Sequence, residues 1–191
     1  MEKLKLNSQA PRFVLNDVFG RTIDLGSYQG KKVFIGFFRN VGCPFCNIRV
    51  HNLTKAHQGF KEQGLEMIFF FESPQEVILR STFHREVSPV PIIADPTKEW
   101  YDAYGLEETS PSQRTITRLA SSLSAALRAK LRGLPVHLPT HGESNDTLPA
   151  EFLLDEELVI RELHYAEHFA DRMKTDAIQE FARQQMVFKS I

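Results

Sequence analysis

The most informative stretch of the chain is residues 33–46, which read Val33-Phe34-Ile35-Gly36-Phe37-Phe38-Arg39-Asn40-Val41-Gly42-Cys43-Pro44-Phe45-Cys46. Its first six residues are apolar and rich in Val, Ile and Phe, which is typical of a strand buried on both faces. A helical pattern then runs from Pro44 to His57, with Pro44 suited to the first turn and Gly59 to the stop. A strand, a Cys-x-x-Cys pair and a helix in this order are the arrangement that thiol-disulfide chemistry uses.

The two cysteines of the chain have unequal positions in this arrangement. Cys43 stands at the start of the helix, where unpaired N–H groups and the positive end of the helix dipole favour a thiolate, so we expect an unusually low pKa. Cys46 lies one turn into the helix and should be more buried. We therefore predict that Cys43 attacks the substrate and that Cys46 resolves the product to a Cys43–Cys46 disulfide.

Composition limits the class of protein without identifying it. The chain has 191 residues, 42% of them hydrophobic, and a formal charge of -1, which predicts one soluble globular domain over residues 1–191. Its start lacks the pattern of a signal peptide, and no run is long enough to span a bilayer, so we expect a cytoplasmic protein. The near-zero charge gives no support to nucleic-acid binding, and the lack of a glycine-rich phosphate loop predicts no bound nucleotide. We expect no cofactor.

Hydrophobic patterns predict the other elements of an α/β fold with a central mixed sheet flanked by helices. We expect a β-hairpin at the sheet edge within residues 10–25, a strand at 65–71 that is parallel to the first, a helix at 74–85, a strand at 90–94, a helix from Asp95 to Tyr104, an antiparallel pair at 152–154 and 158–163, and a helix at 170–185.

One segment, residues 106–148, is additional to this pattern. Residues 112–132 have apolar side chains at helical spacing, and the basic residues among them, without an acidic one between, are Arg114, Arg118, Arg128, Lys130 and Arg132. The prolines, Gly142 and Asn145-Asp146 within residues 134–148 indicate a loop that is long enough to act as a lid. We favour a crossover helix with a solvated basic face, and the alternative is a docking surface for an acidic partner or a membrane.

Several motifs together resemble the AhpC/TSA (peroxiredoxin-like, redoxin) family of the thioredoxin fold. They are Ala10-Pro11-x-Phe13-x-Leu15-x-Asp17-x-x-Gly20-x-x-Ile23-x-Leu25, Lys31 to Phe38, Cys43-Pro44-Phe45-Cys46-Asn47, Asp95-Pro96 with Tyr104-Gly105, and Pro149-x-x-Phe152-Leu-Leu-Asp155. The resemblance implies a thioredoxin-like domain with an N-terminal hairpin and a helical insertion before the last two strands. By its place in the motif, Cys43 corresponds to the attacking cysteine.

The resemblance also bears on what Cys43 attacks. Peroxiredoxins have a Pro-x-x-x-Thr/Ser-x-x-Cys loop, and here Gly36 and Asn40 hold the first two of those positions. Asn40 can donate a hydrogen bond but cannot act as the hydroxyl does. The usual distant arginine is replaced by Pro149, although Arg39 or Arg49 could supply the charge. A thiol-dependent peroxidase is therefore the alternative prediction.

Thioredoxin-like disulfide oxidoreductases resemble this chain in having a proline before the late strand. In them the peptide bond is cis, so we predict a cis Leu148–Pro149 bond, and the backbone at Leu148 would offer an edge for a substrate strand. We accordingly predict a thiol-disulfide oxidoreductase, with Cys43 and Cys46 as catalytic residues. The supporting residues are Pro44, Asn40, Arg39, Leu148 and Pro149.

The predicted partners are a disulfide or hydroperoxide substrate and a reductant of the thioredoxin or glutaredoxin type, with no nucleic acid and no membrane; a homodimer is compatible with the sequence. Two other functions stay open. The cysteine pair could be half of a zinc site completed by two histidines, of which His164 and His168 are four apart. The domain could also be a non-catalytic interaction module with vestigial cysteines. No metal is predicted in the favoured function.

Overall fold

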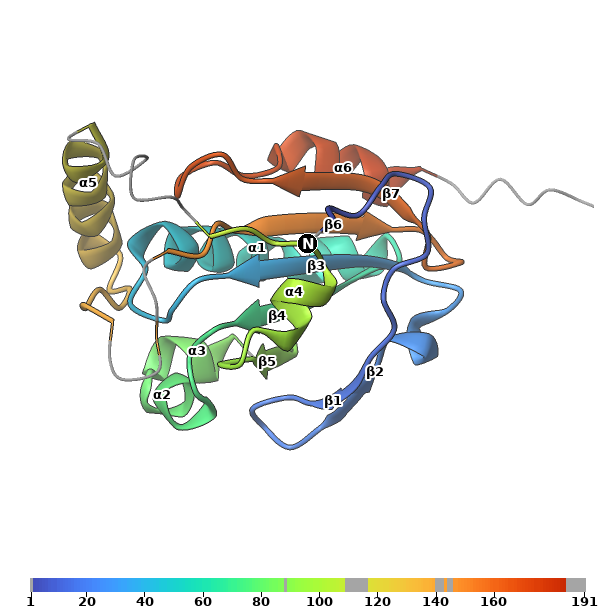
Figure 1. Ribbon diagram of the computed structural model, residues 1–191, viewed down its shortest axis with the longest axis horizontal. Coiled ribbons are helices and arrows are strands. Elements are labelled where there is room, and N and C mark those ends of the chain that lie inside the picture. Colours follow the sequence, from blue (N-terminus) through green and yellow to red (C-terminus); the bar gives the residue numbers. More distant parts are fainter. Residues whose placement is uncertain (1, 88, 109–116, 140–142, 144–145, 185–191) are drawn as a thin grey trace, which may run out of the picture.

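A five-stranded mixed sheet in the order β5-β4-β3-β6-β7 forms the centre of the fold (Figure 1). The computed structural model describes residues 2–87, 89–108, 117–139, 143 and 146–184. Three parallel strands, β3 (Lys32–Phe38), β4 (Leu65–Phe71) and β5 (Ile92–Ala94), are joined by the antiparallel strands β6 (Ala150–Leu154) and β7 (Ile160–Tyr165). The predicted α/β fold with a central mixed sheet is confirmed.

The crossover from β3 to β4 is the helix α1 (Pro44–Glu62), as the sequence predicts. The predicted stop at Gly59 is wrong, because the helix continues through it and is capped at Gln63. Gly64 is the residue that ends the helix, since it takes the left-handed conformation at φ +80° and its N–H bonds the carbonyl of Lys61. The helix therefore starts at the carboxyl end of β3 and returns the chain to the opposite end.

Both faces of the sheet are covered, which explains why β3 is buried along its whole length. On one face, Phe34 and Phe38 pack with α1 and with α6 (Thr175–Arg183). On the other face, Phe37 packs with the N-terminal segment and with α4 (Glu99–Ala103). The last helix begins at Thr175 and not at residue 170, and residue 185 of the predicted range lies outside the described part.

The predicted helix at 74–85 is wrong in one respect, because two helices occupy that range. They are α2 (Gln75–Arg80) and α3 (Thr82–Glu86), separated by Ser81. Ser81 has an extended backbone and its hydroxyl accepts a hydrogen bond from the N–H of His84. A serine that caps the next helix in this way interrupts the preceding one.

The hairpin forms, but it is not part of the central sheet. The strands β1 (Val14–Asn16) and β2 (Thr22–Asp24) pair only with each other, and a 3-10 turn, η1 (Leu25–Tyr28), follows. One hydrogen bond, from the N–H of Val18 to the carbonyl of Ile92, ties the hairpin to β5. The hairpin therefore contacts the edge of the central sheet, as predicted, but does not extend its hydrogen-bonded ladder.

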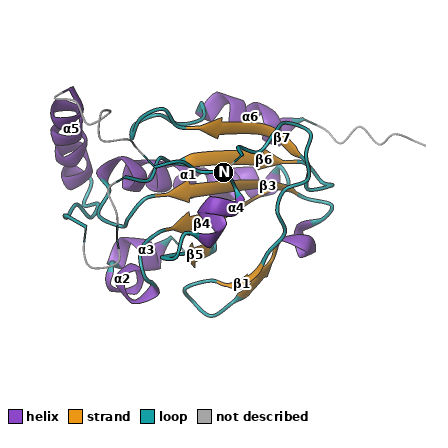
Figure 2. Cartoon of the chain, viewed as in Figure 1, coloured by secondary structure: helices purple, strands orange, loops and turns teal. Residues whose placement is uncertain are grey.

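The insertion contains the helix α5 (Thr117–Leu131), which lies at one end of the molecule beside α1 (Figures 1 and 2). The start of the predicted helix, residues 112–116, lies outside the described part. Within the described ranges, no helix has the length and apolar character that crossing a membrane requires.

Candidate active site

Cys43 is the N-cap residue of α1, and its sulfur faces the first turn of that helix. The N–H of Cys46 donates to Cys43 Sγ at 3.4 Å, while the carbonyl of Cys43 accepts the first helical hydrogen bond, from Asn47. Pro44 occupies the first helical turn, where its missing N–H costs nothing. Both thiols are free and buried, Cys43 at 3% exposure and Cys46 at 0%.

The pKa values of the two thiols shift in opposite directions. Burial acts to raise the pKa of Cys43, but the hydrogen bond from the Cys46 side chain and the charges of Arg39 and Arg172 outweigh it and lower the pKa to about 6. Burial, the hydrogen bond to Cys43 and the charge of Cys43 raise the pKa of Cys46 well above its ordinary value. At neutral pH the pair therefore holds one thiolate, on Cys43, and one thiol, on Cys46.

Two arginines supply the positive charge, one at each sulfur. Arg39 Nη1 lies 3.9 Å from Cys43 Sγ, and Arg172 Nη2 lies 3.6 Å from Cys46 Sγ. Phe169 connects them, since its ring lies 3.9 Å below the Arg39 guanidinium and its carbonyl accepts from Arg172 Nη1. The segment after β7 thus closes over the cysteines, and no local pattern in the sequence could have identified Arg172 or Phe169.

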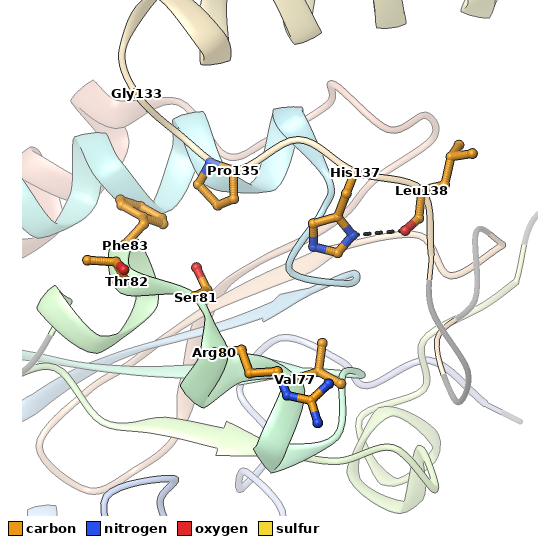
Figure 3. A pocket seen from close by; sticks show the side chains of 9 residues that line it. All are labelled: Val77, Arg80, Ser81, Thr82, Phe83, Gly133, Pro135, His137 and Leu138. Carbon is orange, nitrogen blue, oxygen red and sulfur yellow. Dashed lines mark hydrogen bonds between the residues drawn. The ribbon is translucent and has the colours of Figure 1, made fainter.

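A second segment, residues 134–138, covers the site from the side of α5. Asn47 Nδ2 donates to the carbonyls of Val41 and Pro135, which joins the active-site turn to this segment. A Cβ on Gly42 would lie 2.4 Å from the carbonyl oxygen of His137, so only glycine fits there. Figure 3 shows His137 and Pro135 facing Ser81 across a cavity of about 490 Å³. His137 therefore both lines this cavity and lies against Gly42, the residue before Cys43.

Arg49 holds α1 on the sheet and does not face the cysteines. Its guanidinium forms a bidentate ion pair with Glu151 on β6, at 2.8 Å for each hydrogen bond, and both side chains are buried. Glu151 also accepts the N–H of Met173. The sequence suggested that Arg39 or Arg49 could replace the distant arginine of peroxiredoxins. In the structure Arg39 lies beside Cys43 Sγ, whereas Arg49 pairs with Glu151.

The remaining predicted residues have mixed positions. Asn40 is buried in the turn before Cys43, and its carbonyl accepts the N–H of Cys43. Gly36 lies inside β3, opposite Phe69 and Glu151, so treating it as a loop position of the active site is wrong. A Cβ there would lie 2.8–2.9 Å from the rings of Phe34 and Phe38, which is a packing reason for glycine.

Leu148 and Pro149 precede β6 at the sheet end that carries Cys43. The N–H of Leu148 already bonds the carbonyl of Glu107, and Thr147 pairs with Glu108 in an antiparallel bridge. The chain's own residues 107–108 therefore occupy part of the edge that the sequence assigned to a substrate strand. The isomer of the Leu148–Pro149 bond stays a prediction.

Among the residues that the structure describes, no three His, Cys, Asp or Glu side chains are grouped so that they could hold a metal ion. His164 Nε2 lies 2.9 Å from Asp171 Oδ1, and not at the cysteines. The described arrangement at Cys43 and Cys46 is one for nucleophilic chemistry at sulfur.

Comparison with known sequences matches residues 6–163 to the AhpC/TSA family. The thiol-disulfide oxidoreductase ResA of Halalkalibacterium halodurans is 32% identical over 102 residues, which are 53% of this chain and 57% of that protein. The Bacillus subtilis protein of the same name is 27% identical over 103 residues, or 54% of this chain and 57% of that one. The chain thus spans somewhat more than half the length of these curated relatives.

Solved structures share the fold at low sequence identity. Peroxidoxin BcpB from Mycobacterium tuberculosis superposes with a TM-score of 0.62 at 13% identity and 94% coverage of both chains. A peroxiredoxin 6 variant from Arenicola marina gives a TM-score of 0.66 at 15% identity, covering 93% of this chain and 72% of that one. The predicted thioredoxin-like, peroxiredoxin-like fold is confirmed.

Proposed function

Because the chain belongs to the AhpC/TSA family, we propose that it is a thiol-disulfide oxidoreductase in which Cys43 is the nucleophile and Cys46 the resolving thiol. The observation that carries this proposal is the pair of unequal thiols at the start of α1. A low pKa at Cys43 supplies a thiolate at neutral pH, and a high pKa at Cys46 keeps the second thiol protonated until it is needed.

The first step forms one S–S bond and breaks another. The Cys43 thiolate attacks a substrate disulfide, which gives a mixed disulfide and releases one substrate sulfur as a thiolate that takes up a proton. The negative charge on Cys43, which raised the pKa of Cys46, is then gone. Cys46 then loses its proton, which the released substrate thiolate can accept, and Arg172, at 3.6 Å from Cys46 Sγ, stabilises the Cys46 thiolate that forms.

The second step is attack by Cys46 on Cys43 Sγ, which lies one helical turn away. It releases the reduced substrate and leaves the Cys43–Cys46 disulfide. A dithiol of the thioredoxin or glutaredoxin type would restore the two thiols and become oxidised itself. We place this cycle in a reducing compartment such as the cytoplasm, where closely spaced cysteines more often serve as catalysts than as structural cross-links.

Peroxide reduction is the second candidate function, and the position of Arg39 beside Cys43 favours it. A cation 3.9 Å from Cys43 Sγ can polarise a bound hydroperoxide, and the sulfenic acid formed would condense with Cys46 to the same disulfide and water. Disulfide reduction remains the favoured function, because Asn40 and Pro149 stand where peroxiredoxins have the hydroxyl of their loop and their distant arginine.

Stopped-flow kinetics of the reduced protein would test the choice between substrates. We expect faster reaction with a model disulfide than with hydrogen peroxide, and no turnover of either by Cys43→Ser. A faster peroxide reaction would make peroxidase the function, and full activity of Cys43→Ser would refute both mechanisms.

A variant of Pro149 tests the substrate edge separately. We expect Pro149→Thr to slow the reaction with a disulfide more than the reaction with hydrogen peroxide, because only the disulfide substrate needs the edge beside the cysteines. Equal slowing of both reactions would remove Leu148 and Pro149 from the substrate site.

A further inference from the structure

The helix α5 exposes a row of three leucines to solvent. Leu123, Leu127 and Leu131 follow one another at four-residue spacing, and their exposures are 71%, 61% and 78%. A helix turns by about 100° per residue, so the three side chains lie on one face. We refer to them as the leucine row. Exposed large apolar residues are ordinary when scattered, whereas a continuous row of them marks an interaction surface.

The opposite face of α5 makes the contact with the rest of the protein. Ala125 and Ala129 are buried at 3% and 0% exposure, and α5 packs beside α1. Small side chains on this face let the two helices approach closely. The face of α5 that packs against the protein is thus the alanine face, and the leucine row faces away from it (Figure 1).

Basic side chains flank the leucine row. By helical geometry Lys130 lies beside one edge of the row and Arg128 beside the other, and both are exposed. Arg128 Nη2 donates to Ser124 Oγ at 3.2 Å, one turn earlier on the helix. The sequence has no acidic residue between Glu108 and Glu143, so every charged residue of α5 is basic.

We propose that the leucine row docks on the surface of a bilayer that contains anionic lipids. Leucines on one face, with lysine and arginine beside them, match the apolar interior and negatively charged surface of such a bilayer. A bilayer also accepts a straight row of leucines on a protruding helix without a matching groove. This proposal departs from the prediction of no membrane partner and does not depend on the chemistry of the cysteines.

A second copy of the chain fits this face less well. A symmetric dimer through the leucine row would bring Arg128 and Lys130 of one protomer near the same residues of the other, without acidic residues on α5 to compensate. Like charges brought together in this way oppose association. Charge thus favours an anionic partner over self-association.

Co-sedimentation of the full chain with vesicles would test the proposal. Vesicles of phosphatidylcholine containing phosphatidylserine should bind the protein, vesicles of phosphatidylcholine alone should bind it weakly, and added salt should release it. We expect Leu127→Gln with Leu131→Gln to weaken binding roughly tenfold for each leucine. Arg128→Gln with Lys130→Gln should weaken it about fivefold for each charge.

The matched control is Val14→Gln, which removes an exposed apolar side chain on β1, far in sequence from α5. It should bind vesicles as the unaltered protein does, and all variants should keep the circular dichroism spectrum and the disulfide reactivity. Absence of binding to the anionic vesicles, or equal binding by the leucine variant, would refute the proposal. A dimer in light scattering that the leucine variant abolishes, without vesicle binding, would instead assign the row to a second copy.

Discussion

Cys43 and Cys46 show how position within a single helical turn separates two chemically identical side chains. Cys43 at the N-cap receives the N–H of Cys46 and the nearby charges of two arginines, and its pKa falls to about 6. Cys46 is fully buried beside that thiolate, and its pKa rises. The order of the two proposed chemical steps follows from this difference, because we expect the second thiol to be activated only when the first has lost its charge.

The hydrogen bond between the two side chains can be removed without removing Cys43. We expect Cys46→Ala to raise the pKa of Cys43, since the donor to its thiolate is lost, whereas Cys46→Ser keeps a donor and should raise it less. The rate of alkylation with iodoacetamide as a function of pH measures this pKa. In the unaltered protein the rate should rise as pH increases through about 6 and then level off. Identical profiles for the two variants would mean that this hydrogen bond does not set the pKa.

The two arginines should have separable effects on the reaction. Arg39→Gln should raise the pKa of Cys43 more than Arg172→Gln does, because the charge of Arg39 acts on that thiol more strongly. Arg172→Gln should mainly slow the decay of the mixed disulfide, since Arg172 is the arginine next to Cys46. Alkylation profiles and single-turnover kinetics measure the two effects. The reverse assignment of effects would contradict the roles given to these residues.

The strand β3 and the helix α1 each contain a glycine, and the two glycines have different roles. Gly36 gives room for the rings of Phe34 and Phe38 on the same face of β3. Gly59 lies in α1, and apart from its chain neighbours and the adjacent helix backbone no atom lies within 4 Å of the position a Cβ would take. The first glycine is therefore required by packing, and the second is not.

Alanine substitutions of these two glycines should have opposite effects on stability. Gly36→Ala forces buried aromatic rings to move and should lower the free energy of unfolding by about 1–3 kcal/mol. Gly59→Ala, the matched control, should raise it by up to about 1 kcal/mol through helix propensity. Urea denaturation of the reduced protein measures both. A neutral Gly36→Ala would show that the core beside β3 is loosely packed.

Across the whole molecule, the ion pair of Arg49 and Glu151 connects three separate parts of the chain. It joins α1 to β6, and it reaches the segment before α6 through Met173, whose N–H and carbonyl both take part. The same buried ion pair thus holds both the helix that begins at the cysteines and the segment that carries Arg172.

Breaking this ion pair should cost more than replacing it. Arg49→Met leaves the Glu151 carboxylate buried without its partner and should lower the free energy of unfolding by about 3–5 kcal/mol. The double variant with Glu151→Met removes both charges and should recover most of that loss. Denaturant unfolding of the single and double variants measures the difference. A double variant as unstable as the single one would mean that packing, and not the charge, is what the pair provides.

His84 should make the stability of the protein depend on pH. It is fully buried against Phe71 and Phe83, and burial lowers its pKa to about 3, with the charge of His137 acting in the same direction. The unfolded chain therefore binds a proton at this site below about pH 6.5, where the folded protein does not. The contribution of His84 should fall by roughly 1.4 kcal/mol per pH unit from about 6.5 downward.

Denaturant unfolding at several pH values measures that slope, and His84→Leu should reduce it. His57, whose pKa burial also lowers, remains in both proteins, so the comparison isolates His84. An unchanged slope in His84→Leu would assign the acid sensitivity to other groups.

Much of the site is local in the chain, and that part was predictable. The run from Val33 to Phe38, the cap at Cys43 and the proline at residue 44 are neighbours in sequence, so periodicity and capping preferences apply to them directly. The same local rules failed at Gly59 and at Ser81. A helix tolerates an isolated glycine at modest cost, and a serine within a helical pattern can cap a new helix instead of continuing the old one.

The sequence alone thus established the fold, and it predicted which sulfur attacks and which one resolves. Packing between segments that lie about ninety or more residues apart along the chain brings Arg172 to Cys46, Phe169 to Arg39 and His137 to Gly42. The tertiary structure also pairs Arg49 with Glu151 and places Arg39 beside Cys43. Charge at a sulfur depends on distance in space, and that distance is set by how the β7 and α5 segments pack against the start of α1.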